Sequence, residues 1–145
     1  MQEEEIYMKN NKTILVVDGQ GGGIGKAIIE RLKKESLPLM IIATGTNSIA
    51  SSAMLKAGAD DVATGENAVI FNAGNCDYIL GPVGIISANS MLGEISPAMA
   101  EAIDSSPAVK LLIPLNKCNI YIAGVVDNGL SAKIDDLISK LREII

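Results

Sequence analysis

Residues 13–34 have the sequence TILVVDGQGGGIGKAIIERLKK. The apolar run from Ile14 to Val17 is too short for a helix and is flanked by turn formers, so it predicts a buried strand. Apolar residues then recur at helical spacing between Ala27 and Leu32, with charged residues between them, which predicts an amphipathic helix. Five glycines within seven residues separate the two elements. We therefore expect a strand, a glycine-rich turn and a helix in this order.

Such a turn is typical of an anion-binding loop. It points unpaired backbone N–H groups and the positive end of a helix dipole at one spot, which suits a phosphate or a carboxylate. A tight turn without a ligand needs only one or two glycines, and each glycine costs roughly 0.5–1 kcal/mol relative to alanine in ordered structure. The residues predicted to bind a ligand in this loop are Asp18, Gly19, Gln20, Gly21, Gly22, Gly23, Ile24, Gly25 and Lys26.

Two of these residues have an alternative interpretation that the sequence leaves open. Lys26 is placed to neutralise a bound anion, and it equally fits a solvated lysine on the helix surface. Asp18 is placed to orient a ribose or a metal ion, and it equally fits an ordinary turn residue at the end of a strand.

Composition narrows the class of protein. The chain has 145 residues, which predicts one domain over residues 8–145 after a flexible extension over residues 1–7. Hydrophobic residues make up 48% of the sequence without any tryptophan, so we expect an aliphatic core. Charged residues make up only 20%, which favours an apolar surface and a homo-oligomer. The net charge of −5 argues against a nucleic-acid partner, because phosphate neutralisation needs clustered lysine and arginine.

The sequence also predicts the compartment. No apolar run reaches the roughly 18–20 residues that span a membrane, so we expect no membrane partner. The first ten residues are acidic and lack the apolar core of a secretion signal. Two cysteines without any histidine favour a reducing cytoplasm and free thiols. No cluster of cysteine and histidine predicts a metal site.

Strands and helices alternate after the first helix. Further strands are predicted over residues 39–43, 60–64, 77–80, 110–115 and 119–125. Further helices are predicted from a cap at Thr46 or Asn47 to residue 57, from 65 to about 73, from 85 to 92, from Ser96 to about 103, and from Ser131 to about 143. The segment 65–73 stays open between helix and strand, because residues 68–71 are an unbroken apolar run.

This alternation predicts an α/β fold: a Rossmann-like, doubly wound, mostly parallel sheet with helices on both faces. Only residues 116–118 separate the last two predicted strands. A connection of that length is too short for a parallel crossover, so we expect a C-terminal β-hairpin followed by a helix.

Ligands of such sheets sit outside the carboxyl ends of the strands. The turns expected there add Thr44, Gly45, Thr46, Asn47, Gly81, Pro82, Gly84 and Asn116 to the predicted ligand-binding residues. Lys117 and Cys118 are candidate catalytic residues, because a neighbouring lysine lowers a thiol pKa. Glu66 and Glu94 are candidate acids or bases in an enzyme, and charges at helix ends otherwise.

The spacing Gly19-x-x-x-Gly23-Ile24-Gly25 resembles the glycine segment of short-chain dehydrogenases. The Tyr-x-x-x-Lys pair of that superfamily is absent, and so is an acidic residue after the second strand that would hold a ribose. The cofactor is therefore open, with NAD(P) or another nucleotide as the candidates. The loop also departs from the P-loop pattern, which disfavours a magnesium-nucleotide hydrolase.

Five segments are long and specific: DGQGGGIGKAI at 18–28, GTNSIASSAMLKAGAD at 45–60, TGENA at 64–68, GPVGIISANSMLGEISPAMAEAI at 81–103 and IPLNKCN at 113–119. Through these segments, nearly the whole chain resembles a bacterial family catalogued as domain of unknown function 3842. The resemblance implies a Rossmann-like fold and supplies no reaction and no catalytic residues. Three hypotheses follow: a protein that binds a nucleotide or phosphorylated small molecule, a small NAD(P)-dependent oxidoreductase, and a ligand-free homo-oligomeric interaction protein.

Overall fold

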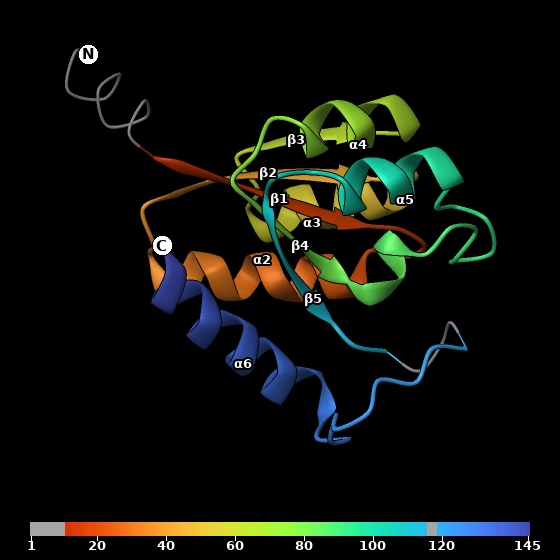
Figure 1. The fold of residues 1–145 in the computed structure, drawn as a ribbon. Helices are drawn as coiled ribbons and strands as arrows, with labels where there is room; N and C mark the ends of the chain where they lie inside the picture. The colour runs from red at the N-terminus through yellow and green to blue at the C-terminus, as the bar shows by residue number, and fades with distance from the viewer. Residues whose placement is uncertain (1–10, 116–118) are drawn as a thin grey trace, which may run out of the picture.

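Five parallel strands form one sheet in the order β3-β2-β1-β4-β5 (Figure 1). The computed structural model describes residues 11–115 and 119–145. The elements in chain order are β1 (Lys12–Asp18), α2 (Gly23–Glu35), β2 (Leu39–Gly45), α3 (Ser48–Ala57), β3 (Asp61–Thr64), α4 (Glu66–Ala73), β4 (Tyr78–Pro82), the 3₁₀ helix η1 (Val83–Ile86), α5 (Pro97–Asp104), β5 (Val109–Ile113) and α6 (Gly129–Ile144). This is the predicted Rossmann-like α/β fold.

Strand β1 is the centre of the sheet. It pairs in parallel with β2, from Lys12 opposite Leu39 to Asp18 opposite Gly45, and with β4 on its other side. Parallel sheets of this kind are covered on both faces, so their strands read as continuous apolar runs rather than alternating ones. The four residues Ile14–Val17 are accordingly all buried.

The two faces of the sheet carry separate cores. Ile14 and Val16 pack with residues of α2, α3 and α6, and Leu15 and Val17 pack with residues of α4, η1 and α5. Figure 1 shows α2 and α6 side by side below the strands, with α4 and α5 above them. This three-layer arrangement leaves the carboxyl ends of the strands as the edge on which loops gather.

Capping residues explain where the helices begin. The Asn47 side chain accepts a hydrogen bond of 2.9 Å from the N–H of Ala50 at the start of α3. The Ser96 hydroxyl accepts a hydrogen bond from the N–H of Met99 at the start of α5, and Pro97 is the first residue of this helix. Both starts agree with the sequence, and the segment 65–73 is the helix α4 rather than a strand.

The predicted C-terminal hairpin is wrong in its second strand. Residues 119–128 form no strand, and β5 pairs with β4 alone among the described residues. Pro114 directly follows β5 and has no N–H to continue a ladder, and Gly124 with φ of +86° interrupts the apolar run. The β-branched residues of this segment indicated a strand, but most of them are exposed and have no facing surface to pack on.

Two helix predictions also need correction. Residues 85–92 are not a helix: η1 ends at Ile86 and turns follow it. The Ser90 hydroxyl donates a hydrogen bond to the carbonyl of Gly84, which competes with helical pairing. The last helix begins at Gly129 instead of after a cap at Ser131. Within the described ranges, no helix combines the length and apolarity that crossing a membrane requires.

Candidate functional site

A cavity of about 520 Å³ lies at the carboxyl edge of the sheet, where the strand order changes direction between β1 and β4. This is the position at which open α/β sheets bind ligands. The cavity is lined by Asp18, Gln20, Ile24, Pro82, Gly84, Met91, Leu92 and Leu115. The sequence predicted the first five of these as ligand-binding residues. The other three add apolar surface that no local pattern indicated.

Asp18 ends β1 and ties the loop to the helix. Its carboxylate is 4% exposed and accepts hydrogen bonds from the N–H groups of Gly19 at 2.8 Å and Gly25 at 2.7 Å. Burial raises the pKa of Asp18, the N–H groups of Gly25, Gly19 and Ile24 oppose that rise, and the charge of Glu94 adds to it. Because its two oxygens are already paired, Asp18 acts in this conformation as a structural residue of the loop.

Glu94 is the residue whose place in the site the sequence did not reveal. One of its oxygens, Oε1, accepts from the Gln20 N–H at 3.0 Å, the Thr46 hydroxyl at 2.6 Å and the Asn47 amide at 2.7 Å. The carboxylate therefore bridges the loops after β1 and β2, although it follows β4 in the chain. The hydrogen bond from Thr46 contributes most to lowering the Glu94 pKa, with those from Gln20 and Asn47 adding to it against partial desolvation.

A pH titration checks this arrangement. Since its folded-state pKa is lowered, Glu94 stabilises the fold above its unfolded pKa and loses that effect as the pH falls through its folded value. We expect wild type to exceed Glu94→Gln in free energy of unfolding at about pH 7, and the difference to shrink toward about pH 3. Urea unfolding of both proteins across this range measures it. A difference in free energy of unfolding that does not change with pH would contradict the hydrogen bonds assigned to the Glu94 carboxylate.

Most glycines of the predicted site are required by packing. A Cβ on Gly25 would lie 2.6 Å from the sulfur of Met54, and one on Gly45 would lie 2.4 Å from the Ser51 hydroxyl. Gly22 also needs its φ of +72° to precede helix α2. A Cβ on Gly19 would lie 2.7 Å from the Thr46 hydroxyl. These glycines let the loop, the helix and β2 approach one another, whether or not a ligand binds.

Gly21 and Gly23 are different. A Cβ at either position would meet nothing within 4 Å, and neither has a positive φ. Among the residues that the structure describes, no acceptor is bonded to the N–H of either glycine. The fold itself therefore does not explain why these two positions lack a side chain.

The remaining predicted residues lie elsewhere. Thr44 is fully buried in β2 and its hydroxyl has no hydrogen-bond partner among the described residues. Lys26 points to the groove between α2 and α3 and lies 3.9 Å from Glu30, so it does not line the cavity. Gly81 is buried in β4 and lies against the carbonyl of Val17 in β1. Asn116, Lys117 and Cys118 lie outside the described residues.

Neither a metal centre nor a reactive thiol is evident in the part of the chain that the structure describes. Its cysteine, aspartate and glutamate side chains form no group of three suited to a metal ion, and the sequence contains no histidine. Burial raises the pKa of Cys76 to about 11, and the charge of Asp77 adds to this rise. A thiol with such a pKa is protonated and unreactive near neutral pH.

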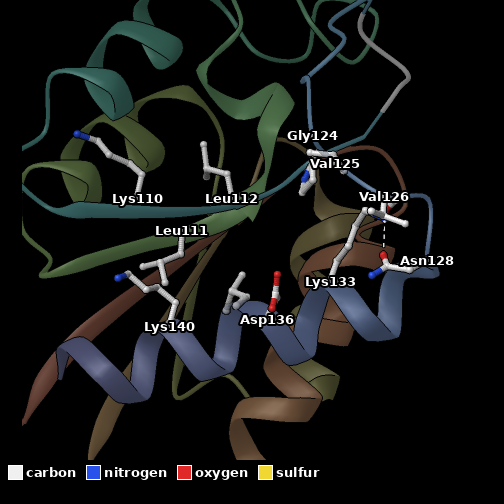
Figure 2. Close-up of a pocket in the computed structure, with 12 residues that line it drawn as sticks. Lys110, Leu111, Leu112, Gly124, Val125, Val126, Asn128, Lys133, Asp136 and Lys140 are labelled. Atoms are coloured by element: carbon white, nitrogen blue, oxygen red, sulfur yellow. Dashed lines mark hydrogen bonds between the residues drawn. The ribbon is translucent and has the colours of Figure 1, made fainter.

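A second hollow of about 450 Å³ lies between β5, α6 and residues 124–128 (Figure 2). Lys133 reaches toward Val126 and Asn128, while Lys110 and Lys140 point away from it (Figure 2). Each ammonium group is already engaged: Lys133 donates to Asn128, Lys110 donates to the carbonyl of Ser106, and Lys140 pairs with Glu143. These lysines do not converge on one spot, so the cavity beside the glycine loop is the better candidate site.

The family model described as "Domain of unknown function (DUF3842)" matches residues 13–145. The chain belongs to this family. Membership agrees with the family resemblance of the glycine loop and its neighbouring segments. No curated protein matches the sequence.

Two solved structures resemble this DUF3842 member at low identity. AibC aligns at 15% identity and a TM-score of 0.48 over 89% of this chain, which spans 41% of the length of AibC. A dodecameric FMN-dependent Ubix-like decarboxylase from Escherichia coli O157:H7 aligns at 15% identity and a TM-score of 0.44, over 90% of this chain and 76% of the other. At these values, neither likeness bears on the ligand or the assembly of the family member.

Proposed function

We propose that this DUF3842 member is a cytoplasmic protein that binds a nucleotide or another phosphorylated small molecule at its glycine-rich loop. The observation that carries the proposal is the pair Gly21 and Gly23, whose open Cβ positions and unpaired N–H groups the fold does not require. Both sit at the positive end of helix α2, where backbone N–H groups favour an anion.

The cavity next to these glycines suits the rest of such a ligand. Ile24, Pro82 and Met91 give it apolar walls, and Gln20 gives it a polar side chain. A nucleotide combines a charged phosphate with a flat, largely apolar base, so it matches a loop of amides beside an apolar cavity. NAD(P) fits this description together with simpler nucleotides, and nothing in the cavity selects among them.

Thermal unfolding tests the proposal with NAD⁺, NADP⁺, FAD, AMP, ATP, S-adenosylmethionine and sugar phosphates. A ligand at about 100 times its dissociation constant stabilises the folded protein by about 2.7 kcal/mol, which corresponds to a rise of several degrees in Tm. We expect at least one nucleotide to produce such a rise. A panel in which no compound raises the Tm would contradict the proposal.

A second candidate function is self-association, and the segment 119–128 favours it. Tyr121 is 84% exposed and Val126 is 69% exposed. Val126 shares a hollow with the edge strand β5, and Tyr121 shares one with Pro114 and Leu115, which follow β5. Apolar side chains next to an open strand edge are typical of an interface. We expect a homo-oligomer in sedimentation at micromolar concentration, and Tyr121→Ser with Val126→Ser to shift it toward the monomer. A monomeric wild type would contradict this candidate.

A further inference from the structure

We propose that the loops after β1 and β2 form an anion-binding nest that the protein's own Glu94 occupies, so that a phosphate or carboxylate group of the ligand binds by displacing the Glu94 side chain. The inference rests on the proposed function and adds to it the mode of entry. It assigns to Glu94 the role of an internal stand-in for the ligand's anion.

The nest consists of three donors from two separate loops. The Gln20 N–H, the Thr46 hydroxyl and the Asn47 amide all converge on Oε1 of Glu94, at 3.0, 2.6 and 2.7 Å. All three donors are neutral, and no lysine or arginine forms an ion pair with Glu94 in the described ranges. Neutral donors that converge on one point are a usual construction of an anion site.

Two of these donors, Gln20 and Asn47, are held by contacts other than those with Glu94. The Asn47 side chain accepts from the Ala50 N–H as the cap of α3, and its amide also donates to the carbonyl of Gln20 at 2.9 Å. Gln20 in turn lies in a tight turn closed by the hydrogen bond from the Gly22 N–H to the carbonyl of Gly19. The donors of Gln20 and Asn47 are therefore preformed for whichever anion enters the nest.

The segment that delivers Glu94 contains two residues with a strained backbone. Met91 and Leu92 both have φ of +56°, a conformation that residues with side chains rarely adopt, and Leu92 is 98% exposed. Both residues also line the cavity at the switch in strand order. Glu94 is therefore attached to a wall of the ligand cavity, and its release would take place beside the bound ligand.

The charge of Glu94 determines whether its removal strengthens or weakens anion binding. With Glu94 in place, an incoming phosphate meets this carboxylate and the nearby buried Asp18. Like charges at close range oppose binding. A ligand that must displace an internal group binds only the molecules in which that group is released, so its apparent affinity falls in proportion to their fraction. Removing the Glu94 side chain should thus strengthen binding of an anion.

Calorimetric titration of the full chain with AMP tests this. We expect Glu94→Ala to bind AMP about tenfold or more tightly than wild type, and Glu94→Gln to show a smaller gain if the alanine variant does not fold. Glu101→Ala removes an exposed glutamate on α5 and should bind as wild type does. In addition, inorganic phosphate should raise the Tm of Glu94→Ala more than that of wild type.

Three results would overturn the inference. Equal AMP affinity in Glu94→Ala and wild type, with binding still abolished by Gly23→Val, would leave the proposed function standing and remove displacement. Weaker binding of AMP by Glu94→Ala, with unchanged binding of the 2′,3′-dideoxy analogue, would show that Glu94 holds the ribose instead. No binding of AMP and no rise in Tm with inorganic phosphate, in wild type and in Glu94→Ala alike, would show that no anion enters the nest and would overturn displacement.

Discussion

Replacing Gly81 by alanine should lower the free energy of unfolding by about 3 kcal/mol. Gly81 lies in β4, where an added Cβ would be 2.3 Å from the carbonyl oxygen of Val17 and 3.2 Å from the Ile85 side chain. The first of these neighbours is the backbone of the central strand β1, which is paired on both sides and cannot move away alone. Urea unfolding followed by circular dichroism measures the loss.

Gly74 provides the control for this substitution. It has φ of −87°, and its added Cβ would meet only the carbonyl of Phe71 at 3.7 Å, an ordinary contact. We expect Gly74→Ala to change the free energy of unfolding by no more than about 0.5 kcal/mol. If Gly81→Ala were equally harmless, the close approach of β4 to β1 at the edge of the site would be wrong.

Replacing Asp18 by alanine should cost about 3 kcal/mol of stability. The substitution leaves the N–H groups of Gly19 and Gly25 without their acceptors, and each buried unpaired donor costs about 1–3 kcal/mol. Asp18→Asn keeps one acceptor oxygen and should lose less. Urea unfolding at neutral pH ranks wild type, Asp18→Asn and Asp18→Ala by their free energies of unfolding.

The matched control is Asp104→Ala, which removes an exposed aspartate at the end of α5 and should have little effect. A loss for Asp18→Ala no larger than for Asp104→Ala would mean that the carboxylate does not hold the loop. The raised pKa of Asp18 implies that its ionisation alone does not stabilise the fold, so the effect must come from the hydrogen bonds.

Much of the fold could be predicted because its signals are local. The run Ile14–Val17, the glycines and the periodic helix that follows lie within about twenty residues. The caps Asn47 and Ser96 each directly precede the helix that they begin. Each signal depends on the neighbouring residues in the chain, which is why strand, turn and helix were placed correctly.

The predictions that were wrong or incomplete depend on contacts between residues far apart in the sequence. The segment 119–125 has the composition of a strand, but whether a strand forms depends on a partner that its own residues do not encode. The hydrogen bond between Glu94 and Gln20 spans 74 positions, and the sequence shows no pattern that pairs them. The roles of the glycines also depend on tertiary contacts, because Gly22 and Gly23 are adjacent in sequence and only Gly22 packs against α3.

The most direct test of the central claim is the ligand-induced rise in Tm of Gly23→Val, measured with the best compound of the panel. A Cβ at position 23 meets nothing within 4 Å, so the unliganded variant should keep its fold while its side chain blocks the approach of a phosphate to the backbone. Gly74→Ala should keep the full rise. Loss of the rise in Gly23→Val alone is the result we predict. An undiminished rise in Gly23→Val would place the ligand elsewhere and contradict the account.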